Sequence, residues 1–200
     1  MSEVCSVATC ALASTAKCSG CHYSRYCGAV HQKAHWKEHK PQCKHIKQAL
    51  ALPAGAVDVR FRWTRSDSDD PTTSWTYLAF AVVCGLEPLA RHLLDLGADK
   101  ELADDQARTP LCVACECRMS EMATLLVERG ADVNAKDTDG RTALMTACYN
   151  GRTDVVKLLV ERGADVNAKA TDGHTPLSNA VIMNHSQLAA YLRTVGATGR

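Results

Sequence analysis

A regular pattern of apolar and polar positions fills the C-terminal two thirds of the chain. Short segments that begin with threonine recur every 33 residues, as TYLAFA at 76–81, TPLCVA at 109–114, TALMTA at 142–147 and TPLSNA at 175–180. A leucine beside a second large apolar residue, and then a Gly-Ala step, follow each segment. The leucines at 93, 126, 159 and 192 and the glycines at 97, 130, 163 and 196 keep the same phase. Two signals that share one period over four copies predict a repeat protein.

Each copy is expected to form a helix, a turn, a second helix and an exposed turn. The threonine is predicted to be the N-cap of the first helix, with Pro110 and Pro176 at the first helical position. The glycine after the second helix is predicted to adopt the left-handed conformation that ends it. Asp-Gly at 139–140 and 172–173 predicts a tight turn, whereas Gln-Ala at 106–107 predicts a less sharp one.

The period, the Thr-Pro-Leu start and the Gly-Ala-Asp end closely resemble the ankyrin repeat. The resemblance implies an all-α ankyrin-repeat solenoid over residues 74–200, in which each copy buries its apolar side only against its neighbours. The four copies are predicted at about 74–105, 106–138, 139–171 and 172–200.

In the ankyrin family, the concave face made by the turns and the inner helices binds other proteins. The candidate contacts here are Arg108, Arg141 and His174 at the turns, and Met145 and Tyr149 on an inner helix. The alternative for each residue is that it only keeps the stack soluble, since most residues of an interface contribute little energy.

Three cysteines, Cys112, Cys115 and Cys117, lie close enough in sequence to suggest a metal site. Within the repeat, however, Cys115 aligns with Cys148, and Cys117 aligns with Cys84. These are positions for small side chains in a helix, where a free cysteine behaves as a small hydrophobic residue. We therefore expect these thiols to pack in the core.

The N-terminal segment carries a different signal. Its ordered series of eight thiols and imidazoles is Cys5, Cys10, Cys18, Cys21, Cys27, His31, His39 and Cys43. Eight such donors suit two closed tetrahedral zinc sites. The segment has too little apolar material to fold alone, and structural zinc supplies on the order of 10–16 kcal/mol per site. The sequence therefore predicts a small, irregular finger stabilised by two Zn²⁺ ions. His35 is a rival ligand, because it shares a helical face with His31 and His39.

The series from Cys5 to Cys43 resembles a MYND-type zinc finger. The matching features are the C-x2-C at 18–21, the Tyr-Cys at 26–27 and the closing His-x3-Cys. The first cysteine pair is more widely spaced than is usual, and His31 replaces a cysteine. The resemblance implies interleaved sites, in which one zinc is bound by Cys5, Cys10, Cys27 and His31 and the other by Cys18, Cys21, His39 and Cys43.

MYND fingers dock short proline-containing peptides, and the positions that the family uses match Gln32 and Trp36. A tryptophan face suits an extended proline-rich strand, whose ordering costs little entropy. The alternative is that Trp36 packs as the small core of the finger.

The distribution of charge also separates the N-terminal finger from the rest of the chain. Residues 1–48 carry seven Lys or Arg against two acids, and the remainder carries 16 bases against 20 acids. The basic finger raises the alternative of a nucleic-acid-associated transcriptional regulator. Gln32 is the only residue of its expected helix that is suited to base readout, so we consider specific DNA recognition the weaker hypothesis.

Together these features predict a finger at 1–48, a linker at 49–73 and the repeats at 74–200. Phe61 and Trp63 in the linker are apolar enough to cover the first repeat. No phosphate loop or nucleophile motif points to an enzyme. Without a signal peptide or membrane segment in the sequence, a cytoplasmic or nuclear adaptor that binds proteins is expected.

Overall fold

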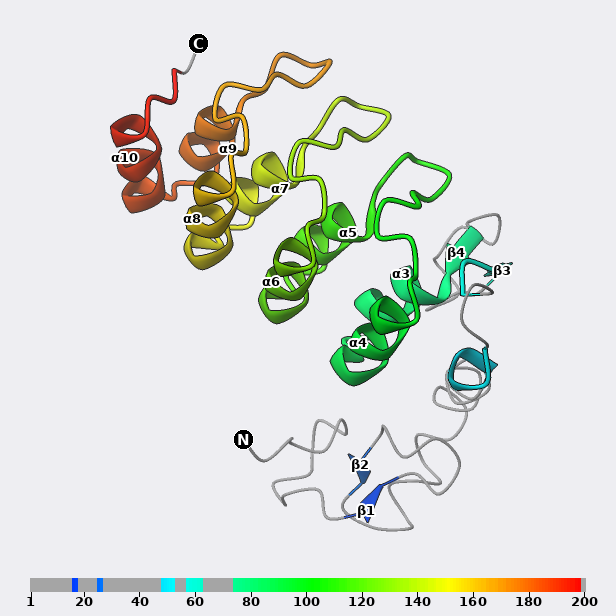
Figure 1. Cartoon of the computed structure of the whole chain (residues 1–200). Coiled ribbons are helices and arrows are strands. Elements are labelled where there is room, and N and C mark those ends of the chain that lie inside the picture. Colours follow the sequence, from blue (N-terminus) through cyan, green and yellow to red (C-terminus); the bar gives the residue numbers. More distant parts are fainter. Residues whose placement is uncertain (1–15, 18–24, 27–47, 53–56, 63–73, 199–200) are drawn as a thin grey trace. The chain divides into compact units, whose positions relative to one another are not determined.

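The computed structural model describes residues 16–17, 25–26, 48–52, 57–62 and 74–198. The chain divides into two compact units, Met1–Pro53 and Ala54–Arg200. Figure 1 shows the helices of the second unit as a row of pairs, with loops that project on one side. The boundaries predicted at residues 48 and 73 stay predictions.

In the first unit, β1 (Ala16–Lys17) pairs antiparallel with β2 (Arg25–Tyr26). Ala16 lies opposite Tyr26, and Lys17 lies opposite Arg25. In sequence, one predicted zinc ligand, Cys18, directly follows β1, and another, Cys27, directly follows β2. All eight predicted ligands, His35 and the peptide-binding pair lie outside the described residues.

The predicted helix–turn–helix unit is present in all four copies of the second unit, which confirms the all-α solenoid. Each copy has an inner helix of seven residues and an outer helix of nine. The pairs are α3 (Tyr77–Val83) with α4 (Glu87–Asp95), α5 (Pro110–Glu116) with α6 (Ser120–Glu128), α7 (Ala143–Tyr149) with α8 (Thr153–Glu161), and α9 (Pro176–Ile182) with α10 (Ser186–Thr194).

The predicted threonine caps are confirmed. The hydroxyl oxygens of Thr76, Thr109, Thr142 and Thr175 each accept a hydrogen bond from the backbone N–H three residues later. These contacts satisfy an N–H group that has no partner inside the helix, and such a cap contributes about 1 kcal/mol. The outer helices end, as predicted, before glycines with φ between +76° and +88°.

The core consists of the apolar residues that recur with the period. One leucine of each predicted pair is fully buried, for example Leu93, Leu126 and Leu159. Small residues such as Ala81, Ala114 and Ala147 are also fully buried, which allows neighbouring inner helices to pack closely. The stack is therefore stabilised by contacts between successive copies.

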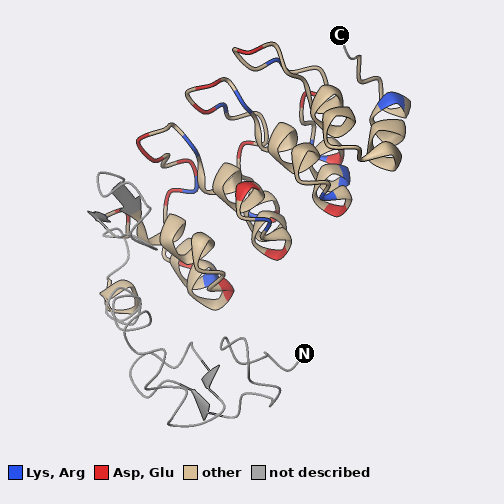
Figure 2. Cartoon of the chain, turned by 180° about the vertical axis from the view of Figure 1, so that it is seen from behind, with Lys and Arg blue, Asp and Glu red and all other residues tan. Residues whose placement is uncertain are grey.

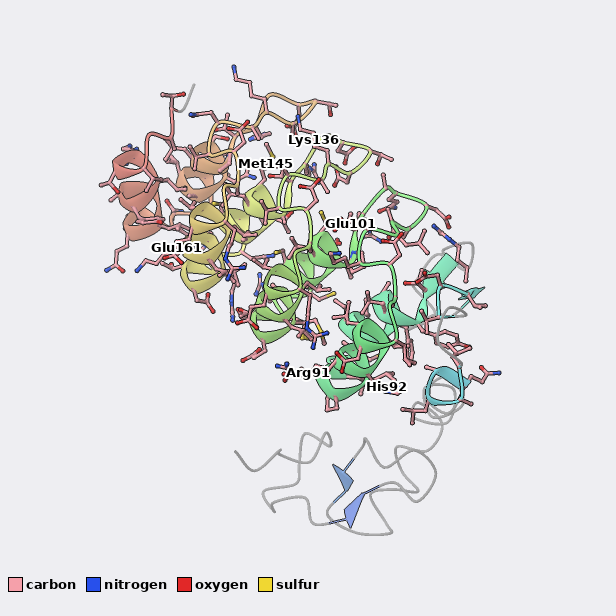
Figure 3. The ribbon with its side chains drawn as sticks, viewed as in Figure 1. Arg91, His92, Glu101, Lys136, Met145 and Glu161 are labelled. Atoms are coloured by element: carbon pink, nitrogen blue, oxygen red, sulfur yellow. The ribbon has the colours of Figure 1, made fainter. Side chains whose placement is uncertain are left out.

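A ladder of hydrogen bonds joins the loops of successive copies. The side chain of Asn134 accepts from the N–H of Asp165 at 2.8 Å, and Glu101 accepts from the N–H of Asp132 at 2.9 Å. Figure 3 marks the position of Glu101 in its loop. We call each of these bonds between neighbouring loops a rung. An equivalent rung recurs in each copy, so the loops stack with the same spacing as the helices.

The ladder extends into the predicted linker. Asp58 accepts from the N–H of Asp99 at 2.9 Å, which is the same rung one copy earlier. Next to it, β3 (Arg60–Arg62) pairs antiparallel with β4 (Ser74–Thr76). Trp63 and the side chain of Phe61 lie outside the described part, so their capping role stays a prediction.

The turn of the second copy differs from expectation. Ala107 adopts φ +56°, close to the +72° of Gly140 in the next copy. The N–H of Asp104 donates to the Arg108 carbonyl oxygen at 3.0 Å, as Asp137 does to Arg141. The expectation of a less sharp turn was therefore wrong. The side chain of Asp104 accepts from two backbone N–H groups and holds the alanine in the left-handed region.

Candidate protein-binding groove

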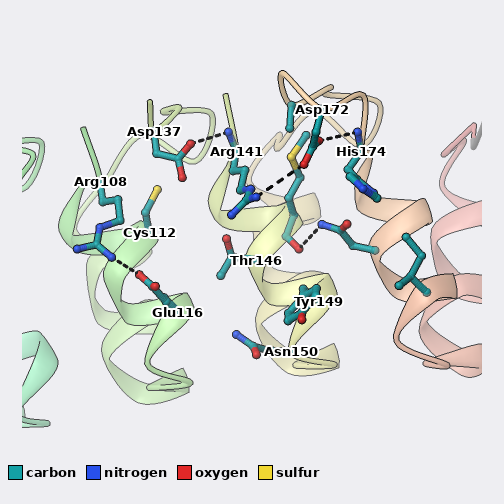
Figure 4. A pocket seen from close by; sticks show the side chains of 14 residues that line it. Arg108, Cys112, Glu116, Asp137, Arg141, Thr146, Tyr149, Asn150, Asp172 and His174 are labelled. Carbon is teal, nitrogen blue, oxygen red and sulfur yellow. Dashed lines mark hydrogen bonds and ion pairs between the residues drawn. The ribbon is translucent and has the colours of Figure 1, made fainter. Parts of the chain in front are cut away.

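The inner helices α5, α7 and α9 and the turns before them border a groove of about 450 Å³ (Figure 4). The five residues predicted for the ankyrin face all line it: Arg108, Arg141, Met145, Tyr149 and His174. They come from three copies, and the 33-residue period places them in rows across the helices. One row contains Arg108, Arg141 and His174, and a second contains Glu116, Tyr149 and Ile182.

Arg108 is held by two carboxylates. Its guanidinium lies 2.7 Å from Asp104 and 2.8 Å from Glu116, and its side chain is only 20 % exposed. Burial by itself lowers the pKa of Arg108, but the hydrogen bond to Asp104 and the charge of Glu116 outweigh it and raise the pKa. Arg108 is therefore a fixed, already neutralised part of the groove.

Arg141 is held less tightly. Its nitrogens lie 3.7 Å from carboxylate oxygens of Asp139 and Asp172, and its side chain is 51 % exposed. The backbone N–H of His174 donates to Asp172 at 3.0 Å, and this bond, with Arg141 nearby, lowers the pKa of Asp172. The carboxylate of Asp172 consequently stays ionised at neutral pH.

Met145 has a different environment from the other four predicted residues. Its side chain is fully buried in a small cluster with Ala168 and Ala170. Its carbonyl oxygen accepts from the side-chain nitrogen of Asn179 at 3.2 Å. Met145 thus supports the groove from below, while the surface is formed by its neighbours.

Tyr149 and Ile182 form the apolar side of the groove. They are 48 % and 54 % exposed, whereas Val83, in the same row of the first copy, is 5 % exposed. The groove is therefore formed by the second, third and fourth copies. Glu116 and Ile182 were not among the predicted contacts, although they lie 33 residues before and after Tyr149.

The prediction that the repeat cysteines pack in the core is confirmed for Cys112, Cys115 and Cys148, whereas Cys84 and Cys117 are only partly buried. Cys117 is the C-cap of α5, as Cys84 is of α3. Burial raises the pKa of Cys112 and Cys115 and raises that of Cys148 to about 12. Thiols with raised pKa values are poor nucleophiles and poor metal ligands at neutral pH.

The predicted zinc ligands all belong to the N-terminal segment. Within the part of the chain that the structure describes, no three or more His, Cys, Asp or Glu side chains gather as a metal site would require. The donor set of the first 43 residues, six thiols and the imidazoles His31 and His39, fits structural zinc chemically. Closed sites of this kind leave no position for water or substrate.

Models of known families match nearly the whole chain. The MYND finger matches residues 3–43, ankyrin repeats in three copies match residues 44–137, and ankyrin repeats in many copies match residues 126–180. The ankyrin match begins inside the finger predicted at 1–48 and includes the predicted linker and the rung at Asp58. No curated protein matches the chain significantly.

These matches determine the class of the protein. MYND fingers bind zinc, and both MYND and ankyrin domains are typical non-catalytic modules for protein–protein interaction. Among the described helices, none combines the length and apolar character that crossing a membrane requires. The chain belongs to the proteins that combine an N-terminal MYND zinc finger with ankyrin repeats.

Proposed function

We propose that this protein is a non-enzymatic adaptor that holds two protein partners at once. The ankyrin groove binds one partner, and the finger binds a proline-containing segment of another. Tethering raises the effective concentration of one partner near the other without any new contact between them. We place this activity in the cytoplasm or the nucleus, because the cysteine usage suits a reducing compartment.

The exposure of Tyr149 and Ile182 carries the proposal for the groove. Large apolar side chains that are half exposed and lie in one row lose surface to water when a partner covers them. Tyrosine is also enriched among the residues that contribute most to binding. The rigid helices α7 and α9 hold these two side chains in place before a partner arrives, which lowers the entropic cost of binding.

For the finger, the support comes from the family match and the residue pattern. The match over 3–43 includes Gln32 and Trp36 and the eight donors proposed to bind two structural zinc ions. In this role Trp36 offers its ring to a polyproline strand, and Gln32 hydrogen-bonds the peptide backbone.

The test is quantitative affinity purification from cells that express the protein, with three forms of the full chain. We compare the wild type with Trp36→Ala and with the double variant Tyr149→Ala/Ile182→Ser. Two distinct sets of partners are expected, one lost with each variant. Zinc content and a thermal melt establish that each variant is folded.

Two results would contradict the adaptor. If neither variant loses a partner, the assigned sites are wrong. If the finger instead binds duplex DNA with a steep salt dependence, and no partner depends on Trp36, the nucleic-acid hypothesis is correct.

A further inference from the structure

The charges around the groove indicate what kind of partner segment it accepts. Its lining contains three carboxylates, Glu116, Asp137 and Asp172, against two guanidinium groups. Asp104 and Asp139, which pair with these arginines, raise the number of carboxylates to five. Figure 2 shows acidic residues at the tips of the loops before the inner helices, with basic residues beside them in the same loops. The groove therefore has an excess of negative charge.

The two arginines do not offset this excess for an incoming partner. Arg108 is bonded to two carboxylates and mostly covered. Arg141 lies between Asp139 and Asp172, so an acidic partner would face both carboxylates as well as the guanidinium. Phosphate groups would meet the same repulsion, which disfavours nucleic acid as the occupant of this groove.

The row of Glu116, Tyr149 and Ile182 combines charge with apolar surface. The three residues occupy equivalent positions on neighbouring inner helices, and packed helices lie about 8–10 Å apart. Glu116 pairs with Arg108 at 2.8 Å but its side chain is still 53 % exposed, so a second cation can reach its carboxylate. Glu116 and Tyr149 therefore line one space in which a cation can meet a carboxylate and an aromatic ring (Figure 4). Such a ring attracts a cation within about 6 Å.

We propose that the groove binds a protein segment in which a lysine or arginine is followed or preceded by a large apolar side chain. The basic side chain lies between Glu116 and Tyr149, and the apolar side chain covers Ile182. This inference rests on the proposed function of the groove and adds the chemistry of the partner.

The test is selection from a displayed library of random peptides on the full chain loaded with zinc. Groove-dependent peptides are those that bind the wild type and lose binding to Tyr149→Ala/Ile182→Ser. We expect these peptides to be enriched in a basic residue next to a large apolar one. For a selected peptide, Glu116→Lys is expected to weaken binding by about tenfold or more, since it replaces an attraction with a repulsion.

Glu161→Lys makes the same charge change on the outer helix α8 and controls for the change in net charge (Figure 3). It is expected to leave binding unchanged. Glu116→Lys also removes the ion pair with Arg108, so the contact itself is tested by charge reversal in the peptide. Reversal of the basic residue in the peptide to glutamate is expected to restore binding to the Glu116→Lys variant, as a double-mutant cycle requires for a direct contact.

The outcomes separate the two proposals. Groove-dependent peptides that are acidic, or that lack a basic residue, would overturn the proposed partner chemistry and leave the groove as a protein-binding site. Equal losses with Glu116→Lys and Glu161→Lys would overturn the contact at Glu116. If no peptide depends on Tyr149 and Ile182, both the partner chemistry and the groove site are wrong.

Discussion

At the residue scale, the backbone of Ala107 is strained because a side chain occupies a left-handed position. Its φ of +56° matches positions filled by glycine in the next two copies. The left-handed conformation costs an L-residue about 1–2 kcal/mol, while glycine loses somewhat more entropy on folding. We expect Ala107→Gly to increase the free energy of unfolding by about 0.5–1 kcal/mol, measured by denaturant titration. Ala135→Gly, at a position without positive φ, is the control and is expected to destabilise.

Two glycines at equivalent positions give a matched comparison. Gly85 and Gly151 have φ of +64° and +68°, so alanine is strained at both. At Gly151 the added Cβ would also lie 2.6 Å from the ring of His185, whereas at Gly85 its nearest neighbours are 3.7 Å away. We expect Gly85→Ala to lower the free energy of unfolding, measured by thermal denaturation, by about 1 kcal/mol. Gly151→Ala is expected to lower it by at least about 2 kcal/mol.

The extra loss at Gly151 is expected to come from His185, whose Nε2 lies 3.1 Å from the carbonyl oxygen of Tyr149. The double variant Gly151→Ala/His185→Ala should therefore recover part of the stability. Equal losses at Gly85 and Gly151 would show that the ring moves aside without cost.

At the element scale, the rungs between loops connect one helix pair to the next. Asn134 uses both ends of its amide, because it accepts from the N–H of Asp165 and donates to the carbonyl oxygen of Gly163 at 3.1 Å. Its counterparts Asp58 and Glu101 have carboxylates, which accept a hydrogen bond but donate none. The bond accepted from the backbone N–H of the next loop is therefore the one that these copies share. We expect Asn134→Ala to lower the free energy of unfolding by about 1 kcal/mol and Asn134→Asp by less.

Hydrogen exchange checks the location of this effect. The amide of Asp165 should exchange faster in Asn134→Ala, while the amide of Asp132, which is bonded to Glu101, should keep its rate. Faster exchange throughout the stack would instead mean that the rung stabilises the whole array.

At the scale of the whole molecule, the two compact units are expected to differ in their dependence on metal. The repeats have an apolar core, whereas the finger is predicted to depend on its metal ligands for stability. Exhaustive chelation is expected to remove two zinc ions per chain and to leave the helical signal of the repeats in circular dichroism. A melting transition of the repeats that disappears with the zinc would contradict this independence.

The sequence alone determined the local structure and the chemistry of the ligands. The threonine caps, the helix-ending glycines and the buried leucines depend on contacts within a few residues or on a strict period, so they can be read directly from the sequence. The thiol and imidazole donors indicate zinc through their chemistry. The rows that contain Arg108 and Tyr149 could also be found from the 33-residue period, although Glu116 and Ile182 in the second row were missed.

Only the tertiary structure decided which repeated positions are available to a partner. Val83 and Tyr149 are equivalent in sequence, yet the first is buried and the second exposed. Arg108 and Arg141 are equivalent too, yet one is fixed by two short ion pairs and the other is half exposed. The reason is physical: local hydrogen bonds and periodic packing recur in every copy, whereas exposure and charge pairing depend on neighbours that differ from one copy to the next.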